Sequence, residues 1–218
     1  MNAPACRMDH LVVAAASLDE GATYLRELLG VTLSPGGGHA RMGTHNRLLR
    51  LGPALYLEVI AVDPAAPPAT RRRWFGLDSP GIRARIGERP RLVHWVASTG
   101  DIAAACAASP EPLGEILEMS RGDFRWRITV PADGSLPGEG LVPSLIRWDT
   151  PAHPAGRLPD AGCSLMKLEG FHTEPARIRA ALKALGLENA LAIFAAEAGE
   201  SPGLVAYIRT PNGLREID

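Results

Sequence analysis

The same order of elements, a strand, a helix and three further strands, is expected three times along this chain. The first occurrence covers residues 7–63, the second residues 90–150 and the third residues 162–218. Each contains apolar strand-like segments bounded by turn residues and one segment with apolar residues at helical spacing. A unit that recurs in this way buries its apolar face against its neighbours. The recurrence therefore predicts an α+β fold built from units that pack together, although the units share few identical residues.

The first unit shows the pattern most clearly. Residues 7–16 form an apolar segment typical of a strand, and Ser17 follows it with the spacing of a capping box at the start of a helix. Apolar residues at helical spacing continue to Gly30, a residue typical of helix ends. Residues 35–38, with three glycines, predict a turn or a flexible loop. Such a loop would leave the adjacent His39 mobile.

Two connections rich in proline separate the units. Residues 64–90 are too long for a simple turn, and Trp74 and Phe75 within them would form a hydrophobic lid or an interface anchor. The second connection, residues 151–162, follows a predicted domain of two units, residues 1–150. The third unit would pack on that domain or extend it.

Composition and charge narrow the range of functions. The 218 residues include 23 basic and 24 acidic ones, so the chain lacks the positive field of a nucleic-acid-binding protein. No apolar segment approaches the roughly 18 residues of a membrane span, and the three cysteines form no disulfide framework. We therefore expect a cytoplasmic protein with neither a nucleic-acid nor a membrane partner. An odd number of units leaves sheet edges unpaired, which favours a homodimer.

Three residues with metal-binding side chains occupy matching places in the first two units. His10 and His94 lie on the first strands of the first and second units, and Glu58 lies on the last strand of the first unit. Paired units would bring them to one point, and two imidazoles with a carboxylate suit Fe(II), Mn(II), Zn(II) or Ni(II). The alternative is structural histidines and a Glu58 carboxylate paired with an arginine. The arginines considered for this pairing are Arg47, Arg125 and Arg127.

Other polar residues are candidates for ligand contacts. His45 and Asn46 lie at the start of a strand, where side chains would reach the mouth of a pocket. His45 would act as a general base, a further metal ligand or a turn-stabilising residue, and Asn46 as a substrate contact. Arg125 and Arg127 share one face of their strand because side chains alternate. On a cavity face they would bind a carboxylate or phosphate; on a solvent face they would be surface charges, with Trp126 in the core.

Several segments of the chain resemble a known family. They are Asp9–Ala14, Leu28–Val31, Met42–Leu49, Tyr56–Ala61 and Phe124–Pro131. On these segments the chain resembles the vicinal oxygen chelate superfamily, in the branch of glyoxalase, bleomycin-resistance and dioxygenase proteins that carry a glyoxalase-like domain. The resemblance spans residues 8–185 and weakens in the third unit.

The resemblance implies βαβββ units whose mixed sheets curl into an open barrel around a cavity, with two units paired about a pseudo-twofold axis. In metal-using members, the ligands come from the first and last strands of the paired units. The corresponding places in this chain are His10, Glu58, His94 and Ser144. Serine is a poor ligand for a divalent ion, so the last place departs from the four-ligand pattern of glyoxalase I.

Two functions follow from the residues and the resemblance. The first is a metal-dependent enzyme of lyase, isomerase or dioxygenase type that acts on a small oxygen-rich metabolite. In that enzyme His10, Glu58 and His94 would hold the ion, with His45 and Glu58 as the catalytic residues. The second is a metal-free protein that sequesters a small molecule, as bleomycin-resistance proteins do. The two histidines and the glutamate favour the first function, and Ser144 favours the second.

Overall fold

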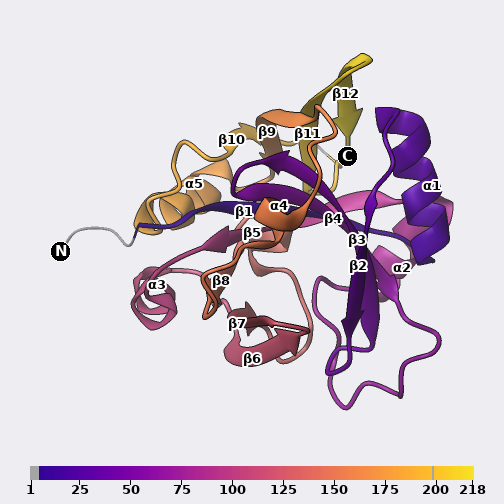
Figure 1. Ribbon diagram of the computed structural model, residues 1–218. Coiled ribbons are helices and arrows are strands. Elements are labelled where there is room, and N and C mark those ends of the chain that lie inside the picture. Colours follow the sequence, from indigo (N-terminus) through magenta and orange to yellow (C-terminus); the bar gives the residue numbers. More distant parts are fainter. Residues whose placement is uncertain (1–4, 198) are drawn as a thin grey trace.

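The computed structural model describes residues 5–197 and 199–218 and confirms the predicted α+β fold. The strands of the first two units form one eight-stranded mixed sheet, which curls strongly into an open half-barrel (Figure 1). The strands of the third unit form a separate four-stranded sheet. Within the described ranges, no helix is long and apolar enough to cross a membrane.

The first unit runs from strand to helix to three strands, as its sequence pattern predicts. Its elements are β1 (Arg7–Ala14), α1 (Leu18–Leu29), β2 (Ser34–His39), β3 (Thr44–Gly52) and β4 (Leu55–Val62). The hydroxyl of Ser17 accepts a hydrogen bond from the backbone N–H of Glu20 and so caps the start of α1. Gly30 ends the helix in the left-handed conformation, with φ of 72°, which glycine adopts without steric cost.

The second unit repeats this order with one short 3-10 helix inserted before its last strand. Its elements are β5 (Arg91–Ser98), α3 (Ile102–Ala108), β6 (Glu115–Arg121), β7 (Phe124–Val130), η1 (Pro137–Gly140) and β8 (Ser144–Trp148). The strand order of the large sheet is β2-β3-β4-β1-β5-β8-β7-β6. In each unit the first strand therefore pairs in parallel with the last strand of the same unit.

The two units meet where β1 and β5 pair antiparallel at the centre of the sheet. His10 lies opposite Val96, and Val12 lies opposite His94. Each histidine lies opposite the residue that follows the other histidine by two positions on the neighbouring strand. A pseudo-twofold axis therefore passes between β1 and β5. This register places the two histidines at symmetric positions.

Side chains of the large sheet alternate between two buried cores. On β1, Leu11 and Val13 belong to an outer core on the convex face, whereas Val12 and Ala14 belong to an inner core on the concave face. Both faces are covered, which explains why the second half of β1, Leu11–Ala14, is apolar without interruption. His10 has the same parity as Val12 and therefore faces the concave side.

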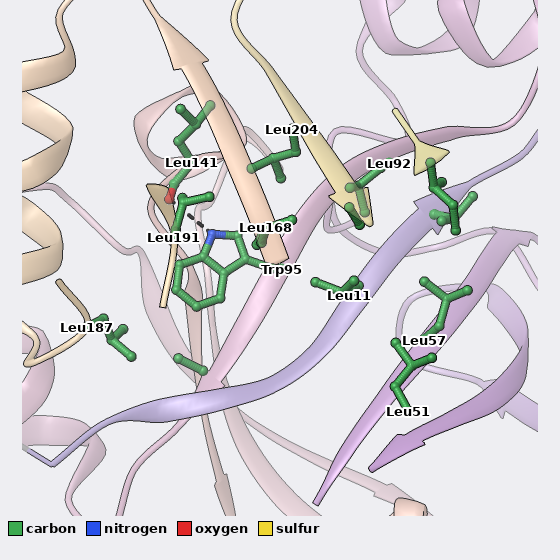
Figure 2. Close-up of a cluster of buried hydrophobic side chains, with 14 of the residues drawn as sticks. Leu11, Leu51, Leu57, Leu92, Trp95, Leu141, Leu168, Leu187, Leu191 and Leu204 are labelled. Atoms are coloured by element: carbon green, nitrogen blue, oxygen red, sulfur yellow. Dashed lines mark hydrogen bonds between the residues drawn. The ribbon is translucent and has the colours of Figure 1, made fainter. Parts of the chain in front are cut away.

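The third unit keeps the order of elements but pairs its strands differently. Its elements are β9 (Ser164–His172), α5 (Pro175–Ala184), β10 (Ala192–Ala195), β11 (Gly203–Thr210) and β12 (Gly213–Ile217). Here the first strand, β9, lies between β10 and β11 and does not pair with the last strand. The sheet packs on the outer core, where Leu168 and Leu204 join Trp95 (Figure 2). The indole N–H of Trp95 donates to the carbonyl of Leu141 at 3.0 Å.

The two connections contribute short helices, α2 (Pro80–Glu88) and α4 (Pro154–Arg157). The long connection that contains α2 fills the concave side of the half-barrel. Its residues Trp74, Phe75, Leu77 and Ile86 are buried in the inner core beside residues from the large sheet. An apolar segment between the two units therefore closes the hollow that the curled sheet creates.

Candidate functional site

Glu58 and Ser144 occupy matching places in the two units. Glu58 on β4 pairs with Val12 of β1, and Ser144 on β8 pairs with Val96 of β5. Val12 and Val96 each lie two residues beyond a first-strand histidine, so the register confirms that Ser144 stands where the first unit has Glu58. Both side chains are buried.

The first pair consists of His10 and Glu58, which face each other on the concave side. Nδ1 of His10 lies 2.7 Å from a carboxylate oxygen of Asp9, and Nε2 lies 3.7 Å from Oε2 of Glu58. The imidazole also stacks on Tyr56, with ring centroids 4.5 Å apart. Because Nδ1 is bonded to Asp9, the other ring nitrogen of His10, Nε2, is the one directed toward Glu58.

Asp9 supports His10 from within the sheet. A register shift between Met8 and His10 interrupts the regular alternation of β1, and Asp9 reaches the side chain of the next residue there. Its carboxylate also accepts from Nε1 of Trp148 at 2.9 Å and from Nε2 of His153 at 3.1 Å. Burial alone would raise the pKa of Asp9. Hydrogen bonds and charge from the two histidines outweigh burial, so the pKa lies well below its ordinary value.

Asn46 holds the Glu58 carboxylate from the other side. Its side-chain amide N–H donates a short hydrogen bond to Oε1 of Glu58. Among the described residues, no arginine lies within 4.0 Å of this carboxylate, so the considered pairing with Arg47, Arg125 or Arg127 does not occur. Asn46 thereby orients one oxygen of Glu58 and leaves Oε2 directed toward His10.

The glycine run packs against Asn46 and is not the turn that its composition predicts. Residues 34–39 form β2, which pairs with β3 at one edge of the large sheet. The backbone N–H of Gly37 donates to Oδ1 of Asn46 at 2.9 Å. A Cβ at Gly36 would overlap that oxygen and lie 2.6 Å from the Asn46 carbonyl oxygen. Glycine is therefore required for close approach to Asn46 rather than for a turn.

His39 is likewise buried rather than mobile. Its Nδ1 lies 3.2 Å from the hydroxyl of Thr44, and its ring packs edge-on against Trp74. Nη1 of Arg121 donates to Nε2 of His39 at 3.2 Å. Burial, and then the positive charge of Arg121, lowers the pKa of His39 to about 3. His39 is therefore a neutral acceptor for the guanidinium.

In the second pair, His94 is bonded to its own unit. Nδ1 donates to the carbonyl of Gly140 at 3.2 Å, and Nε2 accepts the backbone N–H of Ser144 at 3.0 Å. The Ser144 hydroxyl lies 3.0 Å from the same nitrogen. Burial lowers the pKa of His94 to about 3, so its ring is neutral. Both ring nitrogens already have partners, in contrast to His10.

A cavity of about 20 Å³ lies beside the first pair, enough for about one water molecule. Its wall is formed by polar residues from the sheet and by aromatic and aliphatic residues of the inner core. They are His10, His39, Asn46, Tyr56, Glu58, Trp74, Phe75, Arg121, Trp126, Ile128, Ile146 and Trp148. His94 does not line it. Phe75 has φ of 56°, an uncommon conformation for a non-glycine residue, and stacks on Trp74 over the cavity.

Four residues considered for the site lie elsewhere. His45 and Arg47 line a different surface cavity on the outer face, where Nδ1 of His45 is 3.9 Å from Asp63. Arg127 pairs with Asp149 at 2.9 Å, and Arg125 is exposed. Trp126, between the two arginines, is buried in the inner core. Of the two arrangements considered for this strand, the structure has the arginines on the outside.

Asp9, Arg121, His39 and His153 were missed by sequence reasoning. The alternation of β6 could have indicated Arg121, because Leu117 and Met119 of the same parity are buried while Glu118 and Ser120 are exposed. No comparable signal exists for Asp9, which depends on a register shift in β1. His153 reaches the site from a connection.

The donors fit a divalent ion in part. The Nδ1–H of His10 donates to a carboxylate and the Nδ1–H of His94 donates to a carbonyl, the usual supports of metal-binding histidines. Oε2 of Glu58 and, when His10 is neutral, Nε2 of His10 offer free electron pairs. Nε2 of His94, however, is occupied by the Ser144 N–H. Within the described ranges, no group of three His, Cys, Asp or Glu side chains is arranged to hold a metal ion.

Comparison with known proteins gives a family for this chain. A family model described as a glyoxalase-like domain matches residues 8–186. No curated protein matches. Among solved structures, a hypothetical protein from Staphylococcus aureus is 14% identical with a TM-score of 0.57, over 83% of this chain and 75% of that one. Methylmalonyl-CoA epimerase from Mycobacterium tuberculosis is 19% identical with a TM-score of 0.40, over 65% of this chain and 85% of that one. The family match covers most of the chain and includes both histidine-bearing strands, and by it the chain belongs to the glyoxalase-like domain family.

Proposed function

We propose that this chain is a metal-dependent glyoxalase-like enzyme that acts on a small oxygen-rich metabolite. The observation that carries the proposal is the open pair of His10 and Glu58. Nε2 of His10 and Oε2 of Glu58 face each other at 3.7 Å, and the other polar atoms of both side chains are held by neighbours. The family itself supports an enzyme or a binding protein of the vicinal oxygen chelate type.

The electrostatics of this pair favour a cation between the two atoms. In the neutral tautomer that keeps its proton on Nδ1, His10 presents Nε2 as an acceptor, like the Glu58 oxygen that faces it, and both side chains are buried. Two buried acceptors that face each other are unfavourable unless a proton donor or a metal ion bridges them. His10 and Glu58 would hold a divalent ion, and His94 would join them by giving up its bond to Ser144.

The residues around this pair would each have a defined task. When bound, a divalent ion would polarise a substrate oxygen. Asp9 would keep the His10 proton on Nδ1 and so fix which nitrogen faces the substrate. Oε2 of Glu58 is the oxygen that Asn46 leaves free, so it would hold the ion and, once released from it, would accept or return a proton. Trp74 and Phe75 would exclude water from the cavity.

A second candidate function is a metal-free protein that binds a small molecule. The two bonds between His94 and Ser144 favour it, because they satisfy the nitrogen that a third ligand would need. In that case His10, Glu58 and Asn46 would bind the ligand by hydrogen bonds. The aromatic wall of the cavity would supply most of the contact area.

Metal analysis separates the two functions. The protein is purified without a histidine tag, dialysed and analysed for Fe, Zn, Mn and Ni, together with His10→Ala and Glu58→Ala variants. We expect one ion per chain in the wild type and its loss in both variants, and His45→Ala serves as a control because His45 lies on the outer face. Absence of an ion, with no rise in Tm when any of the four metals is added, would support the metal-free function.

We further propose that the chain forms a homodimer through the edges of the four-stranded sheet. Its edge strands are β10 and β12, which carry the exposed side chains of Phe194 and Leu214. Light scattering after size-exclusion chromatography would give twice the chain mass. A monomeric mass at every concentration would contradict it.

A further inference from the structure

Arg121 is a cation that enters the site from the far edge of the sheet. It is the last residue of β6, and alternation turns it to the same side as Leu117 and Met119. Its stem packs so closely on β2 that a Cβ at Gly37 would lie 2.8 Å from Cδ of Arg121. The two edges of the curled sheet therefore meet at this side chain.

The guanidinium of Arg121 is anchored by neutral groups only. Nη1 donates to Oδ1 of Asn46 at 3.0 Å and to Nε2 of His39 at 3.2 Å. Within the described ranges, no carboxylate oxygen lies within 4.0 Å of its nitrogens, in contrast to Arg127, Arg73 and Arg177. One nitrogen is thus fixed, while Nε and Nη2 have no hydrogen-bond acceptor among the described groups.

Arg121 also connects the inner cavity with an open groove. It lines the cavity beside His10 and Glu58, and it lines a surface groove of about 350 Å³. The other residues of the groove come from β2, β3, the β6–β7 turn and the segment around α4. They are Pro35, Gly36, Leu48, Gly122, Asp123, Phe124, Pro154, Arg157 and Leu158. Arg121 is thus the residue that the groove shares with the cavity beside His10.

We propose that Arg121 binds the carboxylate of a small organic acid and that such an acid is the ligand of this site. This inference rests on the proposed function, because it places the reacting part of the acid at His10 and Glu58. The two free nitrogens of a guanidinium match the two oxygens of a carboxylate, which gives a bidentate pair. Because Asn46 bonds both Arg121 and Glu58, it sets the spacing between the acid-binding group and the reacting pair.

The charge at this end of the site supports an anionic ligand. Glu58 and Asp9 lie at the His10 end, while the Arg121 end has only neutral partners. A carboxylate at Arg121 would therefore be attracted by an unpaired positive charge in a partly buried place, where screening by water is reduced. An uncharged ligand would leave that charge without a counter-ion.

Isothermal titration calorimetry with matched probes tests the inference. The probes are glycolate, pyruvate and malonate, each compared with its own amide, and inorganic phosphate; the protein is first passed over a chelating resin so that a metal ion cannot contribute. We expect at least one of the acids to bind the wild type about 10-fold or more tightly than its amide. Arg121→Gln should abolish that preference, and Arg121→Lys should retain part of it. Arg125→Gln, on the outer face of the neighbouring strand, should change nothing.

Several results would overturn the inference. They are equal binding of acid and amide, an unchanged preference in Arg121→Gln, binding of phosphate but of no acid, and no binding of any probe to the wild type. The metal content of Arg121→Gln separates this inference from the proposed function. Lost acid binding with unchanged metal content supports the Arg121 assignment alone. A wild type that holds no metal but binds an acid through Arg121 rejects only the metal-dependent reaction.

Discussion

The backbone N–H of Ser144 donates a hydrogen bond to Nε2 of His94 at 3.0 Å, at the place where the first unit keeps Nε2 of His10 open toward Glu58. The two units are symmetric in backbone register but not in chemistry. With serine in place of an acidic side chain, the second histidine bonds the last strand of its own unit, β8. The pseudo-twofold axis thus relates one open pair to one closed pair.

We predict that His94 contributes mainly to stability. His94→Ala would leave the carbonyl of Gly140 and the N–H of Ser144 buried without partners, and it would create a cavity. Its free energy of unfolding should fall by about 2–4 kcal/mol in urea denaturation. His45→Ala, on the partly exposed outer face, should change it by less than about 0.5 kcal/mol. Equal losses in both variants would contradict a structural role specific to His94.

The glycine run supplies a matched pair of substitutions. Gly36→Ala places a methyl group against Asn46, whereas a Cβ at Gly38 would have no atom within 4 Å. We expect Gly36→Ala to lower the free energy of unfolding by about 1–3 kcal/mol and Gly38→Ala to change it little. Because Asn46 orients Glu58, Gly36→Ala should also weaken ligand binding. Similar unfolding curves for the two variants would show that β2 does not pack on Asn46 as described.

Buried neutral histidines predict a dependence of stability on pH. Burial lowers the pKa of His39 and His94 from 6.5 to about 3. Between these values the unfolded chain binds a proton on each histidine and the folded chain does not, so stability falls as pH falls below 6.5. Each histidine would contribute a slope of about 1.4 kcal/mol per pH unit. His39→Gln and His94→Gln should each reduce the slope of the free energy of unfolding against pH by about 1.4 kcal/mol per pH unit, the equivalent of one bound proton. An unchanged slope would contradict the neutral state of that histidine in the folded protein.

Much of the architecture could be predicted because it depends on local patterns. The helix that begins after Ser17 and ends at Gly30 follows from capping residues and apolar spacing. The strands around His10 and Glu58 follow from apolar runs, and the two residues meet because the first and last strands of the same unit pair in parallel. The equivalence of Ser144 and Glu58 also follows from counting along matching strands, and the register confirms it.

The remaining features depend on long-range contacts or on a local irregularity, which residue patterns do not encode. The glycines of β2 resemble a turn, yet they lie in a strand, and Gly36 allows Asn46 to approach the backbone. The sequence does not show whether Arg125 and Arg127 face the cavity or the solvent, because that depends on whether Trp126 between them is buried in the inner core. Asp9 reaches His10 because of a register shift in β1. His153 and Arg121 join the site only because distant segments close over it.

The buried carboxylate of Asp9 accepts hydrogen bonds from His10, Trp148 and His153. Asp9→Asn replaces one acceptor oxygen by an N–H₂ group, so at least one buried donor loses its partner and the His10 proton is no longer fixed on Nδ1. If His10 binds a metal ion, affinity measured by competition with a chromogenic chelator should fall about 10–100-fold, because the supporting carboxylate is lost. His153→Gln removes only one donor to Asp9 and keeps the Asp9–His10 bond, so its metal affinity should stay close to that of the wild type. Equal losses in the two variants would mean that Asp9 acts through packing rather than through His10.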